Sequence, residues 1–268
     1  MDPIQPRVAA AAAIDVEEIA PAVARVAIAN PPLNVLTQAV RRELGIFFAG
    51  AQERRDLRCV IFGSGERAFS AGADLREFPL RFDATVARAH GENAHRMMRA
   101  LVELDIPAIA SIRGFCMGGG FELALGCTFR LAARNAVFAL PEIDRGVWPG
   151  TGGIALLTRL IGPVAAKKML YGGQRIDAGQ ALVLGIVDEI VDNDALDQRA
   201  LELASLYASK PGQSVRTITS LADHEFRSAF RRHLEVELEA FVLAYQSHDA
   251  AEGNQAFFEK RAPLWRHR

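Results

Sequence analysis

The sequence has few cysteines and no excess of charge, and each scarcity excludes a class of protein. Its 268 residues include only three cysteines, Cys59, Cys116 and Cys127, and no pair of them has the spacing of a metal or redox site. We therefore expect buried thiols in a reducing compartment, and a cytoplasmic protein. The formal net charge is -1, which favours neither nucleic acid nor an anionic membrane as a partner.

Long apolar runs and metal-binding patterns are also missing. No stretch reaches the roughly 18 consecutive apolar residues that a transmembrane helix needs. The six histidines form no His-Glu-x-x-His pair and lie in charged stretches typical of solvated helix faces, so we expect no metal site. The N-terminus lacks the basic start and strongly apolar centre of a secretory signal, and residues 1–20 are predicted to be a frayed leader.

Strand and helix patterns alternate between residues 21 and 200. Because a helix that connects parallel strands must cover a face of their sheet, this order predicts a layered α/β core over 21–200. Two apolar runs on either side of Arg134 and Asn135 are predicted to pair as a hairpin. The expected strands are 21–30, 57–63, 108–113, 129–133, 136–140 and 186–191, and the expected helices are 37–54, 84–104, 121–127, 152–161, 163–171 and 177–184.

The remaining residues, 201–268, carry no strand pattern and are predicted to be a helical region. The expected helices there and at its boundary are 195–210, 214–223, 225–247 and 253–261. The helix at 225–247 alternates Glu with Leu, Val and Phe. Such a helix fits an exposed amphipathic surface and equally fits packing against a partner subunit.

Two glycine-containing segments offer backbone N–H groups to a ligand. Residues 67–75, RAFSAGADL, are alone more typical of an ordinary tight loop. Residues 113–122, RGFCMGGGFE, bring three consecutive glycines to the start of a helix, where unpaired N–H groups and the helix dipole stabilise a negative oxygen. The glycine order fits neither G-x-G-x-x-G nor a phosphate-binding P-loop, and the chain has no G-x-S-x-G.

Two glutamates lie near these segments. Glu122 stands in an otherwise apolar helix, where burying a carboxylate is costly without a partner or a purpose. Glu142 follows an apolar strand and precedes a second glycine-rich segment, where a lone carboxylate is usually a cap or a solvated charge. Two close carboxylates cannot both ionise cheaply, so one would serve as an acid beside a base. This pair suits a reaction with an enolate oxygen and two proton transfers, although spacing alone leaves open whether the side chains meet.

Three segments in order, AFSAGADL, GGGFELAL and PEIDRGVWPGTGG, resemble the crotonase superfamily, and its enoyl-CoA hydratases most closely. The resemblance runs from about residue 22 to the C-terminus. It implies a spiral of ββα units followed by a helical trimerisation region, with assembly into a homotrimer or a dimer of trimers. It also implies addition of water across the 2,3 double bond of an enoyl-CoA thioester, with no cofactor besides the CoA of the substrate.

The resemblance assigns roles to individual residues. Ala73 and Gly119 match the two backbone amides that hold the thioester oxygen. Glu122 matches the base that activates water, Glu142 the acid that protonates the α-carbon, and Gly150 a backbone position that helps to hold the water. The positions matched to CoA contacts are Leu33, Ala71, Asp74, Phe257 and Lys260. Pro31-Pro32 departs from the family, because many members have a basic residue there near the CoA phosphates.

Other interpretations remain open at this point. Isomerases of the superfamily commonly keep only the later acid, so Glu122 argues against a pure Δ3-Δ2-enoyl-CoA isomerase but leaves mixed activity open. Related hydrolases, dehalogenases and decarboxylases generally change one or both acids. A non-catalytic binding or scaffold protein is the alternative outside enzymes. The acyl group is expected near residues 78–98, with Phe78, Phe82, Met97 and Met98 as candidates and core packing at least as good an interpretation of the two methionines. Trp148 is expected to narrow the pocket near Glu142, in favour of a short or unusual acyl group.

Overall fold

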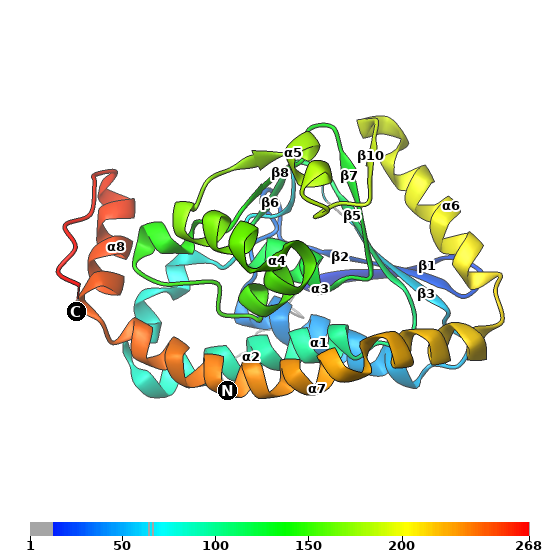
Figure 1. Cartoon of the computed structure of the whole chain (residues 1–268), viewed down its shortest axis with the longest axis horizontal. Coiled ribbons are helices and arrows are strands. Elements are labelled where there is room, and N and C mark those ends of the chain that lie inside the picture. The colour runs from blue at the N-terminus through cyan, green and yellow to red at the C-terminus, as the bar shows by residue number, and fades with distance from the viewer. Residues whose placement is uncertain (1–12, 64, 66, 268) are drawn as a thin grey trace, which may run out of the picture.

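The computed structural model describes residues 13–63, 65 and 67–267, and two β-sheets flanked by helices form its centre (Figure 1). The strands are β1 Ile14–Ala20, β2 Val23–Ile28, β3 Cys59–Gly63, β4 Ala68–Ser70, β5 Ala108–Ile112, β6 Phe115–Met117, β7 Phe129–Ala133, β8 Val137–Ala139, β9 Ile176–Asp177 and β10 Glu189–Val191. The α-helices are α1 Gln38–Glu53, α2 Ala84–Val102, α3 Gly119–Gly126, α4 Gly153–Gly172, α5 Ala178–Val183, α6 Leu196–Ala208, α7 Gly212–Tyr245 and α8 His248–Glu259. Short 3-10 helices are η1 Leu75–Glu77, η2 Pro79–Phe82, η3 Pro141–Arg145 and η4 Asn193–Ala195.

The two sheets are built by a repeated unit. One sheet has the order β1-β2-β3-β5-β7-β10, and the other has the order β4-β6-β8-β9. The runs β3-β4-α2, β5-β6-α3 and β7-β8-α4 each give one strand to each sheet and then a helix. Strands from successive units pair in parallel within both sheets. This arrangement confirms the predicted α/β spiral of ββα units.

The predicted hairpin of β7 with β8 is wrong. A turn does separate the two strands, because the N–H of Ala136 donates to the carbonyl of Ala133 at 2.9 Å. However, β7 pairs with β5 and β10, whereas β8 pairs with β6 and β9. Both strands are largely buried, so their partners are set by which sheet covers their apolar faces, a long-range choice that the local sequence does not specify.

Part of the predicted leader 1–20 is instead an edge strand. β1 pairs antiparallel with β2, with Ile14 opposite Ile28, through a turn in which Ala22 has a φ of 62°. Four successive residues of β1 are exposed and three of them are acidic, which suits a free sheet edge. That charge hides the apolar alternation by which strands are recognised. The alanines at 9–12 lie outside the described residues.

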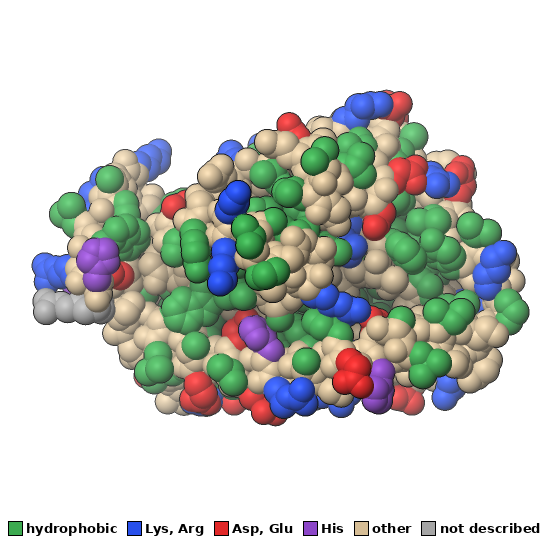
Figure 2. All heavy atoms as spheres, in the orientation of Figure 1, with side chains coloured by type: hydrophobic (Ala, Val, Ile, Leu, Met, Phe, Trp, Pro, Cys, Tyr) green, Lys and Arg blue, Asp and Glu red, His purple; other side chains and the backbone are tan. Residues whose placement is uncertain are grey.

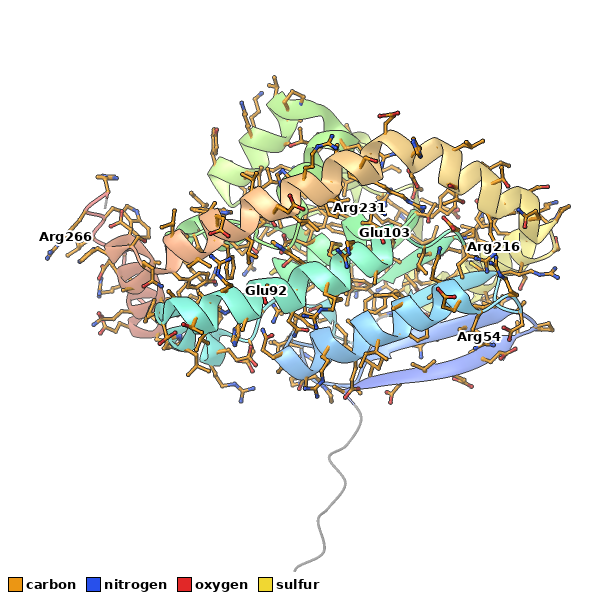
Figure 3. The ribbon with its side chains drawn as sticks, turned by 90° about the horizontal axis from the view of Figure 1, so that it is seen from below. Arg54, Glu92, Glu103, Arg216, Arg231 and Arg266 are labelled. Carbon is orange, nitrogen blue, oxygen red and sulfur yellow. The ribbon has the colours of Figure 1, made fainter. Side chains whose placement is uncertain are left out.

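The C-terminal region is helical, as predicted, but its longest helix is continuous. Helices predicted at 214–223 and 225–247 form the single helix α7, because no proline or glycine interrupts the chain there. Figure 3 shows α7 alongside α2, where Arg231 of α7 reaches Glu103 with an Nε to Oε1 distance of 2.6 Å. Helix α7 therefore closes the side of the molecule on which α2 lies.

Apolar packing ties α7 to the segment before α2. The ring centroids of Phe78 and Tyr245 are 4.7 Å apart, as are those of Phe241 and Tyr245. Helix α6 covers the outer face of the six-stranded sheet through contacts with β3, β5 and β7. In the described part of the chain, no helix has both the length and the apolar character needed to cross a membrane.

Candidate active site

Three neighbouring strands of the four-stranded sheet deliver the predicted site segments. β4 is followed by residues 71–73, β6 by 118–119, and β8 by η3 with Glu142. Because β4, β6 and β8 are parallel, their carboxyl ends lie at the same edge of the sheet. A fourth segment, 150–153, leads into α4 beside them.

Two backbone N–H groups at this edge are unpaired. The carbonyl of Gly72 accepts from the N–H of Leu36 at 2.8 Å, and this bridge leaves the N–H of Ala73 without an acceptor in the described chain. Gly119 is the first residue of α3, so its N–H has no intrahelical acceptor. A Cβ built on Gly119 would lie 3.9 Å from the nitrogen of Ala73. The two N–H groups therefore belong to backbone segments in contact.

The close approach of these segments requires glycine at two positions. Gly72 has a φ of +92°, and a Cβ there would lie 2.8 Å from the carbonyl oxygen of Met117 and 3.3 Å from the nitrogen of Gly119. Gly118 has a φ of +52°, and a Cβ there would lie 2.8 Å from Oε1 of Glu142. A side chain at either position would push apart the loops that carry the N–H groups.

Glu122 is buried and held by the start of α4. Its Oε1 accepts from the N–H of Thr151 at 2.7 Å and from that of Gly153 at 2.9 Å. Burial, followed by repulsion from Glu237, raises the pKa of Glu122 to about 7, and the two N–H groups act in the opposite direction. Glu122 is therefore a carboxylate that titrates near neutral pH.

Glu142 has a different environment. Its Oε2 is buried and has no hydrogen-bond partner among the described residues. Burial, followed by the nearby charge of Glu122, raises the pKa of Glu142 to about 8. Since Glu122 accepts from two N–H groups and Glu142 only from its own backbone N–H, Glu122 ionises first and Glu142 keeps its proton longer.

Glu237 of α7 also holds the loop before α4, and the sequence analysis missed it. Its Oε1 accepts from the N–H of Gly152 at 2.7 Å, between the two N–H groups that bind Glu122. Burial alone would raise the pKa of Glu237, but hydrogen bonds from His233 and His95 bring it below its usual value. The two carboxylates of Glu122 and Glu237 thus fix successive amides of one loop.

His95 corrects the expectation that the histidines lie on solvated faces. It is 8% exposed, and its Nε2 lies 3.0 Å from Oε1 of Glu237 and 3.1 Å from the carbonyl oxygen of Gly150. It is buried because α7 covers α2, a contact between distant segments. The described residues contain no group of three or more His, Cys, Asp or Glu that is arranged to hold a metal ion.

The five residues predicted to be catalytic line one small cavity. This inner cavity has a volume of about 50 Å³ and is lined by Ala73, Gly119, Glu122, Glu142 and Gly150. The other lining residues are Gln38, Arg41, Arg81, His90, Ala94, Trp148, Thr151, Phe241 and Tyr245. The structure thus brings both glutamates and the residues of both unpaired N–H groups to one small cavity.

A larger outer cleft adjoins the inner cavity. It has a volume of about 640 Å³ and shares Ala73, Arg81, Glu142 and Tyr245 with the inner cavity. A space of this size accommodates a ligand as large as a nucleotide-containing cofactor. Three further arginines, Arg145, Arg175 and Arg261, also line it.

The structure places only some of the residues matched to CoA contacts in the lining of the outer cleft. Ala71 and Phe257 line the outer cleft. Leu33 does not, although its carbonyl accepts from the N–H of Ala71 at 2.9 Å. Asp74 also lies outside the lining, where it caps η1 and pairs with Arg76 at 2.7 Å. Lys260 is exposed at the end of α8 and lines neither space.

With this geometry in place, comparison with known proteins identifies the family. The enoyl-CoA hydratase/isomerase family model matches residues 18–268. The chain belongs to this family. A crotonyl-CoA hydratase from Syntrophomonas wolfei is 38% identical over 202 residues, which cover 75% of this chain and 77% of that relative. A short-chain-enoyl-CoA hydratase from Clostridium acetobutylicum is 33% identical over 230 residues, which cover 85% and 88%.

A solved structure of the same family has the same fold. The carnitinyl-CoA hydratase from Mycobacterium avium matches with a TM-score of 0.85 at 30% identity, covering 96% of this chain and 99% of that one. The resemblance to the crotonase superfamily and the fold that it implied are therefore confirmed.

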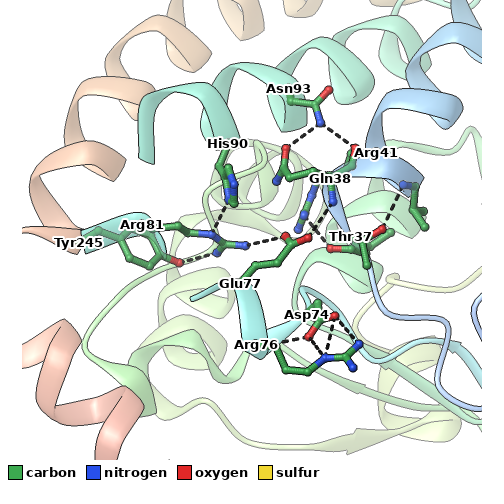
Figure 4. A network of polar contacts seen from close by, with 12 residues as sticks. Thr37, Gln38, Arg41, Asp74, Arg76, Glu77, Arg81, His90, Asn93 and Tyr245 are labelled. Carbon is green, nitrogen blue, oxygen red and sulfur yellow. Dashed lines mark hydrogen bonds and ion pairs between the residues drawn. The ribbon is translucent and has the colours of Figure 1, made fainter. Parts of the chain in front are cut away.

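This family member also has a buried polar network beside the glutamates, which sequence reasoning missed (Figure 4). Arg81 donates from Nε to Nδ1 of His90 at 3.0 Å and from Nη1 to the hydroxyl of Tyr245 at 2.8 Å. Its Nη2 lies 3.9 Å from Oε2 of Glu77. Arg41 donates from Nη1 to a backbone carbonyl at 2.6 Å. These side chains come from α1, η1, η2, α2 and α7, so no single segment of the sequence predicts the network.

The residues expected to contact the acyl group of the substrate lie in three different places. Trp148 lines the inner cavity and Phe78 the outer cleft. Phe82 packs against Phe78, with ring centroids 6.0 Å apart. Met97 and Met98 are fully buried in the main core, which is the ordinary packing role weighed for them. Of these candidates, only Trp148 lines the inner cavity.

Proposed function

We propose that the chain hydrates short 2-enoyl-CoA thioesters by adding water across the 2,3 double bond. One observation carries this proposal: two carboxyl groups in unequal surroundings lie with two unpaired N–H groups in one small cavity. Two relatives named for crotonyl-CoA and short-chain enoyl-CoA hydration add support.

The two N–H groups would bind the thioester oxygen. Addition of hydroxide at the β-carbon gives an enolate, whose negative oxygen needs donors already in place. The N–H groups of Ala73 and Gly119 meet this need without reorganisation, and one such donor typically contributes about 3 kcal/mol to stabilising a transition state. They would form the oxyanion hole of the enzyme.

The glutamates would divide the two proton transfers. Glu122, the more readily ionised, takes a proton from water while the oxygen bonds to the β-carbon. Glu142, which keeps its proton longer, gives that proton to the α-carbon. The substrate thus gains one hydroxyl and one hydrogen, and a proton passes from Glu122 to Glu142 before the next turnover. Gly150 would help to position the water beside Glu122.

The outer cleft would bind CoA, which is part of the substrate, and no separate cofactor is proposed. Ala71 and Phe257 line this cleft. Arg145, Arg175 and Arg261 supply cations in the cleft and would replace the basic residue that Pro31-Pro32 lacks. Leu33, Asp74 and Lys260 remain predicted contacts, at positions adjoining the cleft or on a neighbouring subunit.

A homotrimer, or a dimer of trimers, is the assembly that we propose. Figure 2 shows hydrophobic side chains gathered on the face that carries α4, α5 and α6. On α4 and α5, Val164, Tyr171 and Val183 are 69%, 72% and 88% exposed. Apolar surface of this kind marks an interface more often than free surface. Light scattering coupled to size exclusion should give three or six chains per particle, and a monomer at micromolar concentration would contradict the assembly.

The test of the function is hydration of crotonyl-CoA, followed as loss of the ultraviolet absorbance of the conjugated thioester. The single changes Glu122→Gln and Glu142→Gln should each lower kcat by roughly 10²- to 10⁴-fold. Glu235→Gln, at an exposed site on α7, is the control and should leave kcat unchanged. Full turnover in both active-site variants would overturn the mechanism, and lack of turnover in the unaltered protein would favour a binding role.

A further inference from the structure

The inner cavity contains two buried guanidinium groups that the hydration chemistry does not use. Arg41 and Arg81 are each 4% exposed, and both line the cavity together with the two glutamates. An arginine is almost never fully buried unless it is paired. The groups that pair with these two side chains therefore indicate which kind of ligand the cavity binds.

Among the described residues, a carboxylate pairs with Arg81 and none pairs with Arg41. Glu77 lies 3.9 Å from Arg81, and within the described ranges no carboxylate lies within 4.0 Å of Arg41. The Nε of Arg41 is buried without a hydrogen-bond partner. Burial, followed by repulsion from Arg81, lowers the pKa of Arg41 to about 10. Arg41 is thus a desolvated cation beside a second cation, and an added anion would stabilise both.

The neighbouring polar groups do not satisfy this need. His90 accepts from Arg81, and burial together with both arginines lowers its pKa to about 4, so it is neutral. Tyr245 accepts from Arg81 through its hydroxyl. The Nε2 of Gln38 is another buried donor without a partner. Glu77 and Glu122 partly offset the charge of Arg41 but form no ion pair with it. The cavity therefore keeps two unused buried donors, the Nε of Arg41 and the Nε2 of Gln38.

The CoA phosphates are not the missing anion. The inner cavity, at about 50 Å³, is too small for a nucleotide, whereas the outer cleft of about 640 Å³ has its own arginines. Arg41 also lines a separate cavity of about 510 Å³ between α1 and α2, but Arg81 does not. An anion bound by both arginines must therefore be small, and the end of a short acyl chain meets this condition.

We propose that Arg41 and Arg81 bind a carboxylate at the end of the acyl chain, so that the preferred substrate is a short dicarboxylic 2-enoyl-CoA thioester. This inference rests on the proposed hydratase function. Two guanidinium groups can bind a carboxylate through charge-assisted hydrogen bonds, which are strong in a desolvated site. A neutral alkyl end would leave the donors unpaired, and a quaternary ammonium end would be repelled.

The first experiment uses the unaltered protein and a matched pair of substrates. Glutaconyl-CoA ends in a carboxylate, and 5-methyl-2-hexenoyl-CoA has an isopropyl group of the same shape in its place. We expect kcat/KM for glutaconyl-CoA to exceed that for the isostere by roughly 10²-fold or more. A thioester whose chain ends in trimethylammonium should be the poorest of the three. Equal values for the matched pair, or a preference for the isostere, would overturn the proposal.

The second experiment assigns the preference to the two arginines. Arg41→Met and Arg81→Met should each lower the ratio of the two kcat/KM values about tenfold or more, and Arg41→Lys should restore part of it. Arg42→Met is the matched control, because Arg42 is the next residue of α1 and is exposed. The ratio is measured within one preparation, so partial misfolding cannot change it. An unchanged ratio in both methionine variants would contradict the assignment.

A binding measurement separates this inference from the hydratase function. Glutaryl-CoA and 5-methylhexanoyl-CoA are saturated and cannot be hydrated, and calorimetry gives their dissociation constants directly. Tighter binding of glutaryl-CoA without turnover of any enoyl thioester would retain the anion site and refute the hydratase. Hydration of crotonyl-CoA without any preference for glutaryl-CoA would retain the hydratase and refute the anion site.

Discussion

The inner cavity is lined by hydrogen-bond donors of two kinds, backbone N–H groups and arginine side chains. At what we call the thioester end, the donors are the backbone N–H groups of Ala73 and Gly119. At the acyl end, the donors are the guanidinium groups of Arg41 and Arg81. A backbone donor remains after most substitutions, whereas a side-chain donor is lost when its own residue is substituted. The difference suggests that the first end sets a reaction common to many acyl groups and the second end sets which acyl group is used.

The largest effect should come from deforming the thioester end. Gly72→Ala would place a methyl group 2.8 Å from the carbonyl of Met117, at a φ of +92° that alanine rarely adopts. Because the adjacent N–H of Ala73 would move, kcat should fall roughly 10²- to 10³-fold, and by the same factor for every acyl group. Steady-state kinetics with glutaconyl-CoA and crotonyl-CoA measure both values.

Gly50→Ala is the control for this change. Gly50 is an exposed glycine of α1, and a Cβ there would meet nothing within 4 Å. The alanine should stabilise the helix by about 0.5–1 kcal/mol and leave kcat unchanged. If Gly72→Ala altered one substrate much more than the other, the proposed division between the two ends would be wrong.

A smaller effect should follow from loosening the loop that holds Glu122. In Glu237→Gln, a neutral amide replaces the carboxylate that accepts from the N–H of Gly152, and kcat should fall about tenfold. Repulsion from Glu237 contributes to the raised pKa of Glu122, so its removal should lower that pKa. The acid limb of the pH profile of kcat/KM should therefore move to lower pH.

The displacement of the acid limb reports the repulsion between Glu237 and Glu122, which a general structural defect would not selectively remove. Glu235→Gln, two residues away on the exposed side of α7, should leave both kcat and the limb in place. A loss of activity in Glu237→Gln without movement of the limb would indicate a general structural defect instead.

The same contrast explains what the sequence could predict. The thioester end lies in two short glycine-containing segments, and all five catalytic candidates meet in one cavity. The two arginines of the acyl end lie on α1 and η2, and their polar neighbours lie on η1, α2 and α7, so no local pattern shows this end. One signal was nevertheless present: Arg41 falls on the apolar face of α1 with Leu44 and Phe48, at spacings of three and seven.

Glu237 shows the same signal, because it shares the buried face of α7 with Leu234 and Phe241. A charged residue on an apolar helix face is costly unless it meets a partner, so both positions were recognisable as exceptions. Their partners were not recognisable, since those lie on other elements.

The fold was likewise predictable only in part. The repeated order of strands and helices was predictable from the sequence. The short strands β4, β6 and β9, and the division of β7 and β8 between two sheets, were not.

A several-fold effect is expected from changing the size of the acyl end. Trp148 lines the inner cavity, so Trp148→Ala should enlarge it. The value of kcat/KM for 2-octenoyl-CoA should rise about threefold to tenfold, while that for glutaconyl-CoA should fall by a similar factor as its carboxylate is less well placed. Kinetics with the two substrates test this. A uniform loss for both would place Trp148 in the support of Glu142 rather than in the acyl end.

The smallest effect concerns stability at the thioester end. Burial raises the pKa of Glu142 to about 8, above the value of about 4.3 expected when unfolded. The stability that its protonated form contributes is therefore complete below the unfolded value and is lost as the pH rises through the folded value. Glutamine cannot ionise, so the melting temperature of Glu142→Gln relative to the unaltered protein should rise by several degrees, roughly 5–10 °C, between pH 6 and pH 9. Calorimetric melting curves that stay parallel over this range would mean that Glu142 is ionised at neutral pH, and the acid would have to be sought elsewhere in the cavity.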